Sequence, residues 1–336
     1  MSMPKVIIVG SGLMGRWHAF SALRSGATIT AIVDPNLEKA RALQHEFAAH
    51  NIYKSLDECL QNNASKHKSN IAHICTPDQN HLESIELCLT HKLHCLVEKP
   101  LVSTFEQTKR VLEQANESGL KIAPVHQMPF QSGASRLAAN HANLGKIVRM
   151  THTAFTSGGE GKSETERQHV LLEILPHPLS LFYRFFGERL EADQFNVRRY
   201  ENGELEIDAA VDDSLLRISI SLRARPTRNE LTVAGDKASA HVDLFHGFCT
   251  YESGEVSKRS KILKPFRFGS SLVFDAGRNL VQRSAEKEVA YPGLRNLIRQ
   301  FYRSALEGKE APISEREILL CAEVADRVRT NSDSRS

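Results

Sequence analysis

Three glycines near the start of the chain have the spacing of a phosphate-binding turn. The segment Gly10-Ser11-Gly12-Leu13-Met14-Gly15 follows the apolar run 6–9 and precedes a helical pattern. In such a turn the first glycine permits the tight bend, the second lets the backbone approach a pyrophosphate, and the third lets helix and strand pack closely. Backbone N–H groups and the helix dipole then hold the phosphates. We therefore predict dinucleotide contacts from Gly10, Gly12, Leu13, Met14 and Gly15.

An acidic residue stands where a dinucleotide site needs one. Asp34 lies 19 residues after Gly15, at the end of the second apolar run, 29–33. A carboxylate there accepts hydrogen bonds from the ribose hydroxyls and repels a 2′-phosphate, so the sequence predicts NAD in preference to NADP. The structural alternatives are an ordinary βα turn and a helix cap at Asp34. The common register of strand, glycines and acid favours the cofactor site.

Two further polar segments follow later strands of the same pattern. Cys75-Thr76-Pro77-Asp78-Gln79-Asn80-His81 follows the fourth strand, and Glu98-Lys99-Pro100-Leu101 follows the fifth. The carboxyl ends of parallel strands are where doubly wound sheets bind their ligands. The alternative for Glu98-Lys99-Pro100 is a solvated charged pair at a strand end.

In this order, after an N-terminal G-x-G-x-x-G, these segments resemble the Gfo/Idh/MocA family of glucose–fructose oxidoreductase and inositol dehydrogenase. The resemblance implies an NAD(P)-dependent oxidoreductase acting on CH–OH groups of sugars, sugar derivatives or cyclitols. It implies that Lys99 lies beside the reacting hydroxyl and that Pro100 follows a cis bond. It also implies that Thr76, Pro77, Asn80 and His81 line the nicotinamide side of the cofactor, and that Glu98 and Lys99 belong to the cofactor-binding residues.

The family's second catalytic element, D-x-x-x-H, is matched by Glu173-Ile174-Leu175-Pro176-His177. The resemblance gives His177 the place of the catalytic histidine and Glu173 that of the aspartate. A histidine, with an ordinary pKa near 6.5, suits proton exchange with an alcohol. The chain departs from the family at Ser180, where a second aspartate is usual, and at 126–130, where two arginines are usual. Ser180 and His126 are secondary substrate candidates, and a core or helix-cap role is the alternative for His177.

The implied chemistry is hydride transfer between a nicotinamide and a secondary alcohol or its ketone. His177 would accept or return the hydroxyl proton, and Lys99 would stabilise the alkoxide. One alternative is a sugar-nucleotide or amino-sugar dehydrogenase of polysaccharide or secondary-metabolite synthesis. A second alternative is a non-catalytic, dinucleotide-binding regulatory protein, because positions 126–130, 173 and 180 are altered.

The elements that must position these residues predict an α/β fold of two domains. Apolar strands without in-out alternation alternate with helical patterns up to residue 125, which indicates a doubly wound Rossmann domain. Period-2 segments separated by short turns follow, at 192–200, 206–211, 215–222, 230–234 and 238–244, and they indicate a largely antiparallel open sheet. We predict an NAD-binding domain at 1–125, a substrate-binding and oligomerisation domain at 126–330 and a disordered tail at 331–336. The C-terminal helix would be able to pack back on the first domain.

Composition excludes several classes of partner. The 43 Lys and Arg and 40 Asp and Glu give a net charge of +3 and are scattered, so we predict no nucleic-acid partner. No apolar run reaches the ~20 residues of a membrane span, and no signal segment opens the chain, so we expect a cytoplasmic protein. The six cysteines include no C-x-x-C pair, which predicts reduced thiols and no metal. An open sheet needs cover, which favours a homo-oligomer, a dimer or tetramer.

Overall fold

The computed structural model describes residues 3–62, 69–254, 257–287 and 290–330. The tail predicted to be disordered, 331–336, lies outside these ranges. The chain divides into two compact units. The first comprises Met1–His126 and Leu294–Ala322, and the second comprises Gln127–Gly293 and the residues from Glu323 onward. The sequence predicts a single domain boundary near residue 125, which would place Leu294–Ala322 in the second domain. In the structure these residues group with the first unit.

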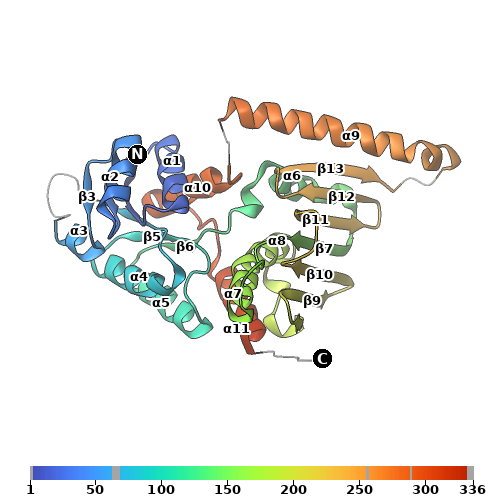
Figure 1. The fold of residues 1–336 in the computed structure, drawn as a ribbon. Helices are drawn as coiled ribbons and strands as arrows, with labels where there is room; N and C mark the ends of the chain where they lie inside the picture. Colours follow the sequence, from blue (N-terminus) through green and yellow to red (C-terminus); the bar gives the residue numbers. More distant parts are fainter. Residues whose placement is uncertain (1–2, 63–68, 255–256, 288–289, 331–336) are drawn as a thin grey trace. The chain divides into compact units, whose positions relative to one another are not determined.

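The first unit contains a six-stranded parallel sheet, the Rossmann sheet that the apolar runs predict (Figure 1). Its strands lie in the order β3-β2-β1-β4-β5-β6, so the order reverses between β1 and β4. The interior strands are buried along almost their whole length because helices cover both faces. The strands are β1 (Lys5–Val9), β2 (Thr28–Val33), β3 (Asn51–Tyr53), β4 (Ile71–Ile74), β5 (His94–Val97) and β6 (Ile122–Pro124).

Helices on the two sides of this sheet follow the doubly wound pattern. In Figure 1, α1, α2 and α10 lie on one side of the sheet and α4 and α5 lie on the other. The last of the first group, α10, comes from the C-terminal part of the chain and packs against α1. The helices are α1 (Leu13–Arg24), α2 (Leu37–Phe47), α3 (Leu56–Asn62), α4 (His81–Thr90), α5 (Phe105–Glu117) and α10 (Leu294–Glu307).

The second unit contains a seven-stranded mixed sheet, in the order β13-β12-β11-β7-β10-β9-β8. Only the central pair, β7 and β10, is parallel, so the prediction of a largely antiparallel sheet is confirmed. The predicted turn at Asn202 and Gly203 has positive φ angles of 64° and 79°. The strands are β7 (Ile147–Phe155), β8 (Asn196–Tyr200), β9 (Glu204–Val211), β10 (Ser214–Ser221), β11 (Arg228–Gly235), β12 (Ala238–Asp243) and β13 (Phe248–Ser253).

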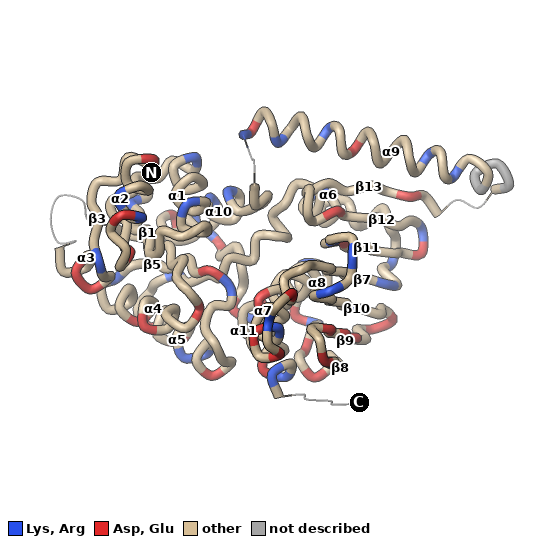
Figure 2. Tube along the Cα trace, viewed as in Figure 1, with Lys and Arg blue, Asp and Glu red and all other residues tan. Residues whose placement is uncertain are grey.

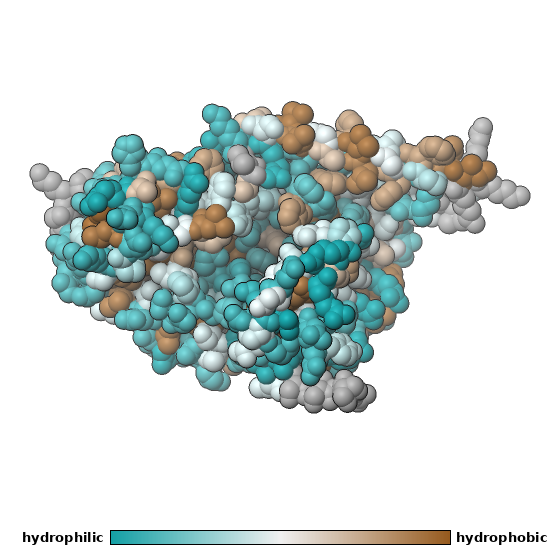
Figure 3. All heavy atoms as spheres, viewed as in Figure 1, coloured by the Kyte–Doolittle hydropathy of each residue, from teal (hydrophilic) through white to brown (hydrophobic). Residues whose placement is uncertain are grey.

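The helices of the second unit include one that the sequence pattern did not predict. This helix, α9 (Lys258–Ala285), packs against β13 and contains Pro265, Gly269 and Gly277, which are poor residues for a helix interior. It exposes apolar side chains such as Phe266 and Val273. Figure 3 shows brown, hydrophobic atoms along the edge of the molecule where Figure 1 draws this helix. The other helices are α6 (Ser132–Asn140), α7 (Glu164–Ile174) and α8 (Pro176–Phe186), while α11 (Glu315–Thr330) runs from the first unit into the second. Short 3₁₀ turns occur at Asp78–Asn80, Met128–Phe130, His141–Leu144, Gly187–Arg189 and Ala192–Gln194.

Charges of both signs are interspersed along both units (Figure 2). On the second sheet, Asp208 of β9 pairs with Arg198 of β8 and with Arg217 of β10. Among the described residues, no helix is long and apolar enough to cross a membrane.

Thiol reactivity tests the packing of both units. All six cysteines are free, and five of them are buried. Burial raises the pKa of Cys59 to about 12 and that of Cys249 to about 11, so few thiolates exist near neutral pH. We expect a thiol reagent at pH 8 to label the native protein slowly and to count six thiols after denaturation. Rapid labelling of several thiols in the native protein would contradict this packing.

Candidate active site

The backbone at the β1–α1 turn is built for close approach. Gly10 has a φ of 98°, and a Cβ there would lie 2.7 Å from the carbonyl oxygen of Cys75. A Cβ on Gly15 would lie 1.9 Å from the carbonyl oxygen of Gly10, so strand and helix pack without room for a side chain. Gly12 differs because no atom lies within 4 Å of its Cβ position. The open space at Gly12, at the start of α1, leaves room for the close approach that a pyrophosphate would need.

Asp34 is held in place by the glycine turn itself. Its Oδ2 accepts hydrogen bonds from the backbone N–H of Ser11 at 2.8 Å and from Ser11 Oγ at 2.7 Å. Its Oδ1 accepts a bond from the backbone N–H of Asn36 at 2.8 Å. Partial burial acts to raise the pKa of Asp34, but these bonds hold it below its ordinary value. A carboxylate has about four acceptor positions, so one remains for a ribose hydroxyl, and release of the Ser11 hydroxyl would free a second.

The helix-cap role that the sequence left open for Asp34 belongs to another residue. The side chain of Asn36 accepts bonds from the N–H groups of Glu38 and Lys39 and caps α2.

A cleft of about 880 Å³ joins the predicted cofactor residues. It runs along the carboxyl ends of β1, β2 and β4, at the point where the strand order reverses. The hydroxyl oxygen of Thr76 is buried there and makes no hydrogen bond within the described part of the chain. An open glycine cradle, an oriented carboxylate and an unused hydroxyl together fit a dinucleotide. The predicted residues that line the cleft are Gly10, Gly12, Leu13, Met14, Asp34, Thr76, Pro77 and Asn80.

Two lysines of the same cleft were missed by the sequence analysis. Lys39 lies in the first turn of α2 and Lys54 follows β3. Neither residue belongs to the glycine motif that the sequence analysis used. Lys39 is only five positions after Asp34, and its charge contributes to the lowered pKa of that carboxyl.

Glu98 and Lys99 follow β5 directly, as the sequence predicts. Lys99 is half-buried, and the Lys99–Pro100 peptide bond is cis, as the family resemblance implies. Glu98 is buried, and its Oε1 lies 3.0 Å from Nε2 of His18 on α1. Its Oε2 accepts the backbone N–H of Lys99 at 3.3 Å. The carboxylate of Glu98 therefore faces the protein interior, and it does not line the cleft.

His81 joins the two predicted loops. Its Nε2 lies 2.9 Å from the carbonyl oxygen of Thr76, and its Nδ1 lies 2.9 Å from the carbonyl oxygen of Pro100. The residue is 1% exposed. Through these contacts with backbone carbonyl groups, His81 holds the loop after β4 against the loop after β5.

The second unit carries the other predicted catalytic residues on α7 and α8. Leu175, which lies between these helices, is itself helical, so the chain turns little there, and Pro176 takes the first position of α8, where its missing N–H costs nothing. His177 and Ser180 are buried in α8. Glu173 lies near the end of α7, and its Oε1 is 3.3 Å from Nε2 of His169 on the same helix. Lys99 belongs to the first unit and His177 to the second.

His126, a secondary substrate candidate, is engaged inside the first unit. It is 2% exposed, and its Nδ1 lies 3.1 Å from Oε1 of Glu317 on α11. This contact joins the segment that follows β6 to α11.

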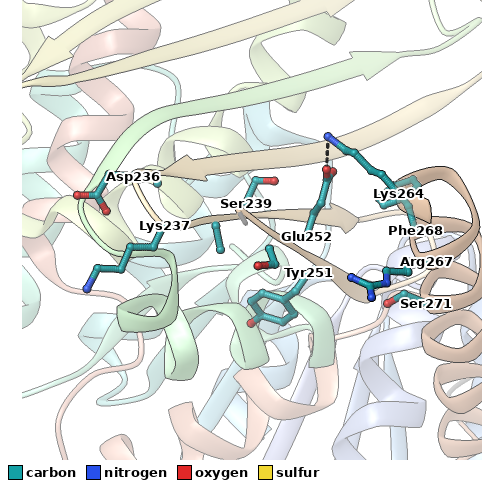
Figure 4. Close-up of a pocket in the computed structure, with 13 residues that line it drawn as sticks. Asp236, Lys237, Ser239, Tyr251, Glu252, Lys264, Arg267, Phe268 and Ser271 are labelled. Atoms are coloured by element: carbon teal, nitrogen blue, oxygen red, sulfur yellow. Dashed lines mark ion pairs between the residues drawn. The ribbon is translucent and has the colours of Figure 1, made fainter. Parts of the chain in front are cut away.

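A separate hollow of about 550 Å³ lies in the second unit between β12, β13 and α9 (Figure 4). Glu252 of β13 and Lys264 of α9 form an ion pair there. Tyr251, Arg267 and Ser271 also line this hollow, whereas the predicted catalytic residues do not.

Comparison with known proteins agrees with the geometry of the first unit. Residues 4–126 match the family model described as oxidoreductase family, NAD-binding Rossmann fold. This match identifies residues 4–126 as similar to the NAD-binding Rossmann domain of the Gfo/Idh/MocA oxidoreductases. The matched segment covers the glycine turn, Asp34, the loop after β4 and Glu98-Lys99-Pro100, which are the residues on which the family resemblance rests.

Curated relatives are similar over part of their length. The chain is 23% identical over 199 residues to a 4-carboxy-2-hydroxymuconate-6-semialdehyde dehydrogenase of Sphingobium sp., which covers 56% of this chain and 61% of the relative. It is 25% identical over 162 residues to an inositol 2-dehydrogenase of Paracoccus denitrificans, covering 47% of each chain. The chain thus aligns with about three fifths and about half of these relatives.

Solved structures are similar over nearly the whole chain. The UDP-N-acetylglucosamine 3-dehydrogenase of Acidithiobacillus ferrooxidans superposes with a TM-score of 0.73 at 16% identity. The match covers 98% of this chain and 97% of that chain. This likeness shows that both units, including the mixed sheet, have the fold of that protein.

Two glycine variants separate the cofactor cradle from the packing of the turn. Gly12→Ala places a methyl group in open space, so we expect an unchanged melting temperature but about tenfold weaker NADH binding, since overpacking costs about 1–3 kcal/mol. Gly15→Ala drives a methyl group into the Gly10 carbonyl, so we expect a lower melting temperature. Thermal unfolding and NADH fluorescence titration measure both effects. Undiminished NADH binding by Gly12→Ala would exclude the cradle as the pyrophosphate site.

Proposed function

We propose that this protein is an NAD-dependent oxidoreductase that transfers hydride between the nicotinamide and a secondary alcohol, or its ketone, of a sugar, sugar derivative or cyclitol. The observation that carries the proposal is the cleft of the first unit. It combines the open cradle at Gly12, the oriented carboxylate of Asp34 and the unused hydroxyl of Thr76 at the carboxyl ends of neighbouring strands. The family match of residues 4–126 supports the redox chemistry, and the inositol 2-dehydrogenase relative supports the substrate class.

In the proposed reaction, the chain's own residues move the proton and stabilise the charge. A bound nicotinamide supplies the site that accepts or gives hydride. His177 takes the hydroxyl proton as general base during oxidation and returns it during reduction. The ammonium group of Lys99 donates a hydrogen bond to the same oxygen and stabilises the developing alkoxide. Glu173 and Ser180 would contact neighbouring hydroxyl groups. The proposal requires the two units to present Lys99 and His177 to one substrate.

We propose NAD as the preferred cofactor because Asp34 stays ionised at the ribose end of the cleft. A carboxylate bonds a free ribose hydroxyl but repels a 2′-phosphate. Lys39 and Lys54 line the same cleft and act in the opposite direction, so the contribution of Asp34 has to be measured.

Assembly into a homo-oligomer stays a prediction from the family resemblance and the open second sheet. Two alternatives from the sequence also stay open: a sugar-nucleotide or amino-sugar dehydrogenase, and a non-catalytic binding protein.

Replacing Asp34 tests the cofactor preference. For Asp34→Ala we expect about tenfold weaker NADH binding, because charged hydrogen bonds to the ribose are worth about 1.5–3 kcal/mol. We expect tighter NADPH binding, because the repulsion of the 2′-phosphate is lost. The lowered pKa keeps this carboxyl ionised, so the wild-type preference should not change between about pH 6 and 8. Asp193→Ala, an exposed aspartate of the second unit, is the matched control. Equal NADH and NADPH affinity in the wild type would contradict the preference.

Replacing Lys99 and His177 tests the mechanism. We expect Lys99→Ala and His177→Asn each to lower kcat about 100-fold or more, with NADH affinity retained, since each group acts on the reacting oxygen. Lys109→Ala on α5 and His45→Asn on α2, both exposed, are the controls. Substrates should include inositols, aldoses, their keto forms and UDP-linked sugars. Turnover of nucleotide-linked sugars alone would favour the first alternative, and NADH binding without any turnover would favour the second.

A further inference from the structure

Four buried side chains of the first unit form one continuous hydrogen-bonded chain. Tyr302 Oη lies 3.1 Å from His73 Nε2, and His73 Nδ1 lies 3.0 Å from His18 Nδ1. His18 Nε2 lies 3.0 Å from Oε1 of Glu98. The two histidines are fully buried, and Tyr302 and Glu98 are 4% and 7% exposed. None of these residues except Glu98 belongs to a motif that the sequence analysis used.

The members of this chain come from four separate elements. His18 is on α1, His73 is on β4, Glu98 follows β5 and Tyr302 is on α10. The other residues of β4 are Ile71, Ala72 and Ile74, so His73 is the polar residue of an otherwise apolar interior strand. Buried polar groups are costly unless all of them are paired, and here each ring nitrogen and each terminal group named above has a partner.

Electrostatics determines which groups can donate. Burial acts to raise the pKa of Glu98, but the bond from His18 and the charge of Lys99 hold it below its ordinary value, so Glu98 is a carboxylate. Burial, with His18 beside it, holds the pKa of His73 well below its ordinary value, so His73 is neutral. Burial raises the pKa of Tyr302, so its hydroxyl keeps its proton.

These states leave two arrangements of protons, and both present a donor to Glu98. When His18 is neutral, Tyr302 donates to His73, His73 donates to His18, and His18 donates to Glu98. When His18 carries two protons, it donates to both neighbours, and His73 donates to the oxygen of Tyr302. A carboxylate only accepts, so in either case the Nε2–H of His18 points at Glu98.

We propose that His18 is a positioning residue for Lys99, acting through Glu98, and that His73 and Tyr302 hold the ring of His18 in the orientation this requires. The second oxygen of Glu98 accepts a hydrogen bond from the backbone N–H of Lys99. The hydrogen-bonded chain therefore ends on the residue that would contact the reacting oxygen. The proposal rests on the proposed function of Lys99. It makes α10, which follows residues Gln127–Gly293 of the second unit in sequence, a structural support of the reaction.

A metal site is the competing interpretation of two histidines and a glutamate in contact. Here the nitrogen and oxygen atoms are hydrogen-bonded to one another: the two Nδ1 atoms of His73 and His18 form one contact, and Nε2 of His18 and Oε1 of Glu98 form the next. Within the described ranges, no group of three or more His, Cys, Asp or Glu residues could hold a metal ion.

Two replacements of His18 form the main test. The side-chain amide nitrogen of glutamine is as many bonds from Cα as Nε2 of histidine, so His18→Gln keeps a donor toward Glu98, whereas His18→Leu removes it. With a substrate that the wild type turns over, we expect kcat to fall about 10- to 100-fold in His18→Leu, since misplaced catalytic groups cost factors of this size. We expect His18→Gln to recover most of kcat, and both variants to keep the NADH Kd of the wild type within about twofold.

Two tyrosine-to-phenylalanine variants extend the test to the other end of the hydrogen-bonded chain, and neither variant removes a ring. We expect Tyr302→Phe to lower kcat about threefold, which is the effect of one hydrogen bond. Tyr251→Phe is the matched control, because it removes a hydroxyl that bonds the carbonyl oxygen of Arg136 in the second unit. In ¹⁵N-histidine NMR spectra of the whole protein, Tyr302→Phe should shift the ring-nitrogen signals of His73 and His18, and Tyr251→Phe should leave them unchanged.

The outcomes separate this proposal from the proposed function. If the wild type turns over no substrate, the proposed function fails, and the positioning role fails with it even if the NMR shifts show that the hydrogen-bonded chain exists. If the wild type is active and His18→Leu folds with undiminished kcat, the positioning role is wrong while the function stands. Should His18→Leu not fold, unchanged kcat and unchanged histidine signals in Tyr302→Phe overturn the proposal.

Discussion

The close approach of the backbone at the β1–α1 turn is the constraint on which the first unit depends. The carbonyl of Gly10 occupies the space of a Gly15 side chain, and Gly10 itself fits against Cys75 only because it has no Cβ. This contact sets the distance between β1, α1 and the loop after β4. It leaves Gly12 open toward the cleft and places Ser11 where its N–H and hydroxyl bond Asp34. The geometry of the proposed dinucleotide site thus follows from a packing requirement.

Buried histidines connect the rest of the first unit to this turn. His81 joins the loops after β4 and β5, while His18 and His73 connect α1 to Glu98 on one side and to α10 on the other. His126 makes a similar contact to Glu317 of α11. Paired polar groups in a low-dielectric interior specify one arrangement strongly, because any other leaves them unsatisfied. These contacts explain physically why Leu294–Ala322 groups with the Rossmann sheet.

The second unit shows where sequence patterns are informative. Strands β8 to β12 were predicted because each alternates inward and outward residues with period two, and short turns separate them. Strand β13 and helix α9 carry weaker patterns. In α9, Pro265, Gly269 and Gly277 interrupt the helical signal, and apolar residues such as Phe274 point outward. Tertiary context overrides local propensity there, so no element was predicted after residue 244 up to the C-terminal helices.

By itself the sequence determined the fold class, the glycine turn with Asp34, and the family resemblance of residues 4–126, because these depend on residue types at short, regular spacings. Only the tertiary structure decided which distant side chains meet. It paired His126 with Glu317, added Lys39 and Lys54 to the cleft, and joined Glu98 to Tyr302 through His18 and His73. The bond between Tyr302 and His73 links residues 229 positions apart, and no periodicity in the sequence records such a contact. The partners become evident only when the packed elements bring the side chains together.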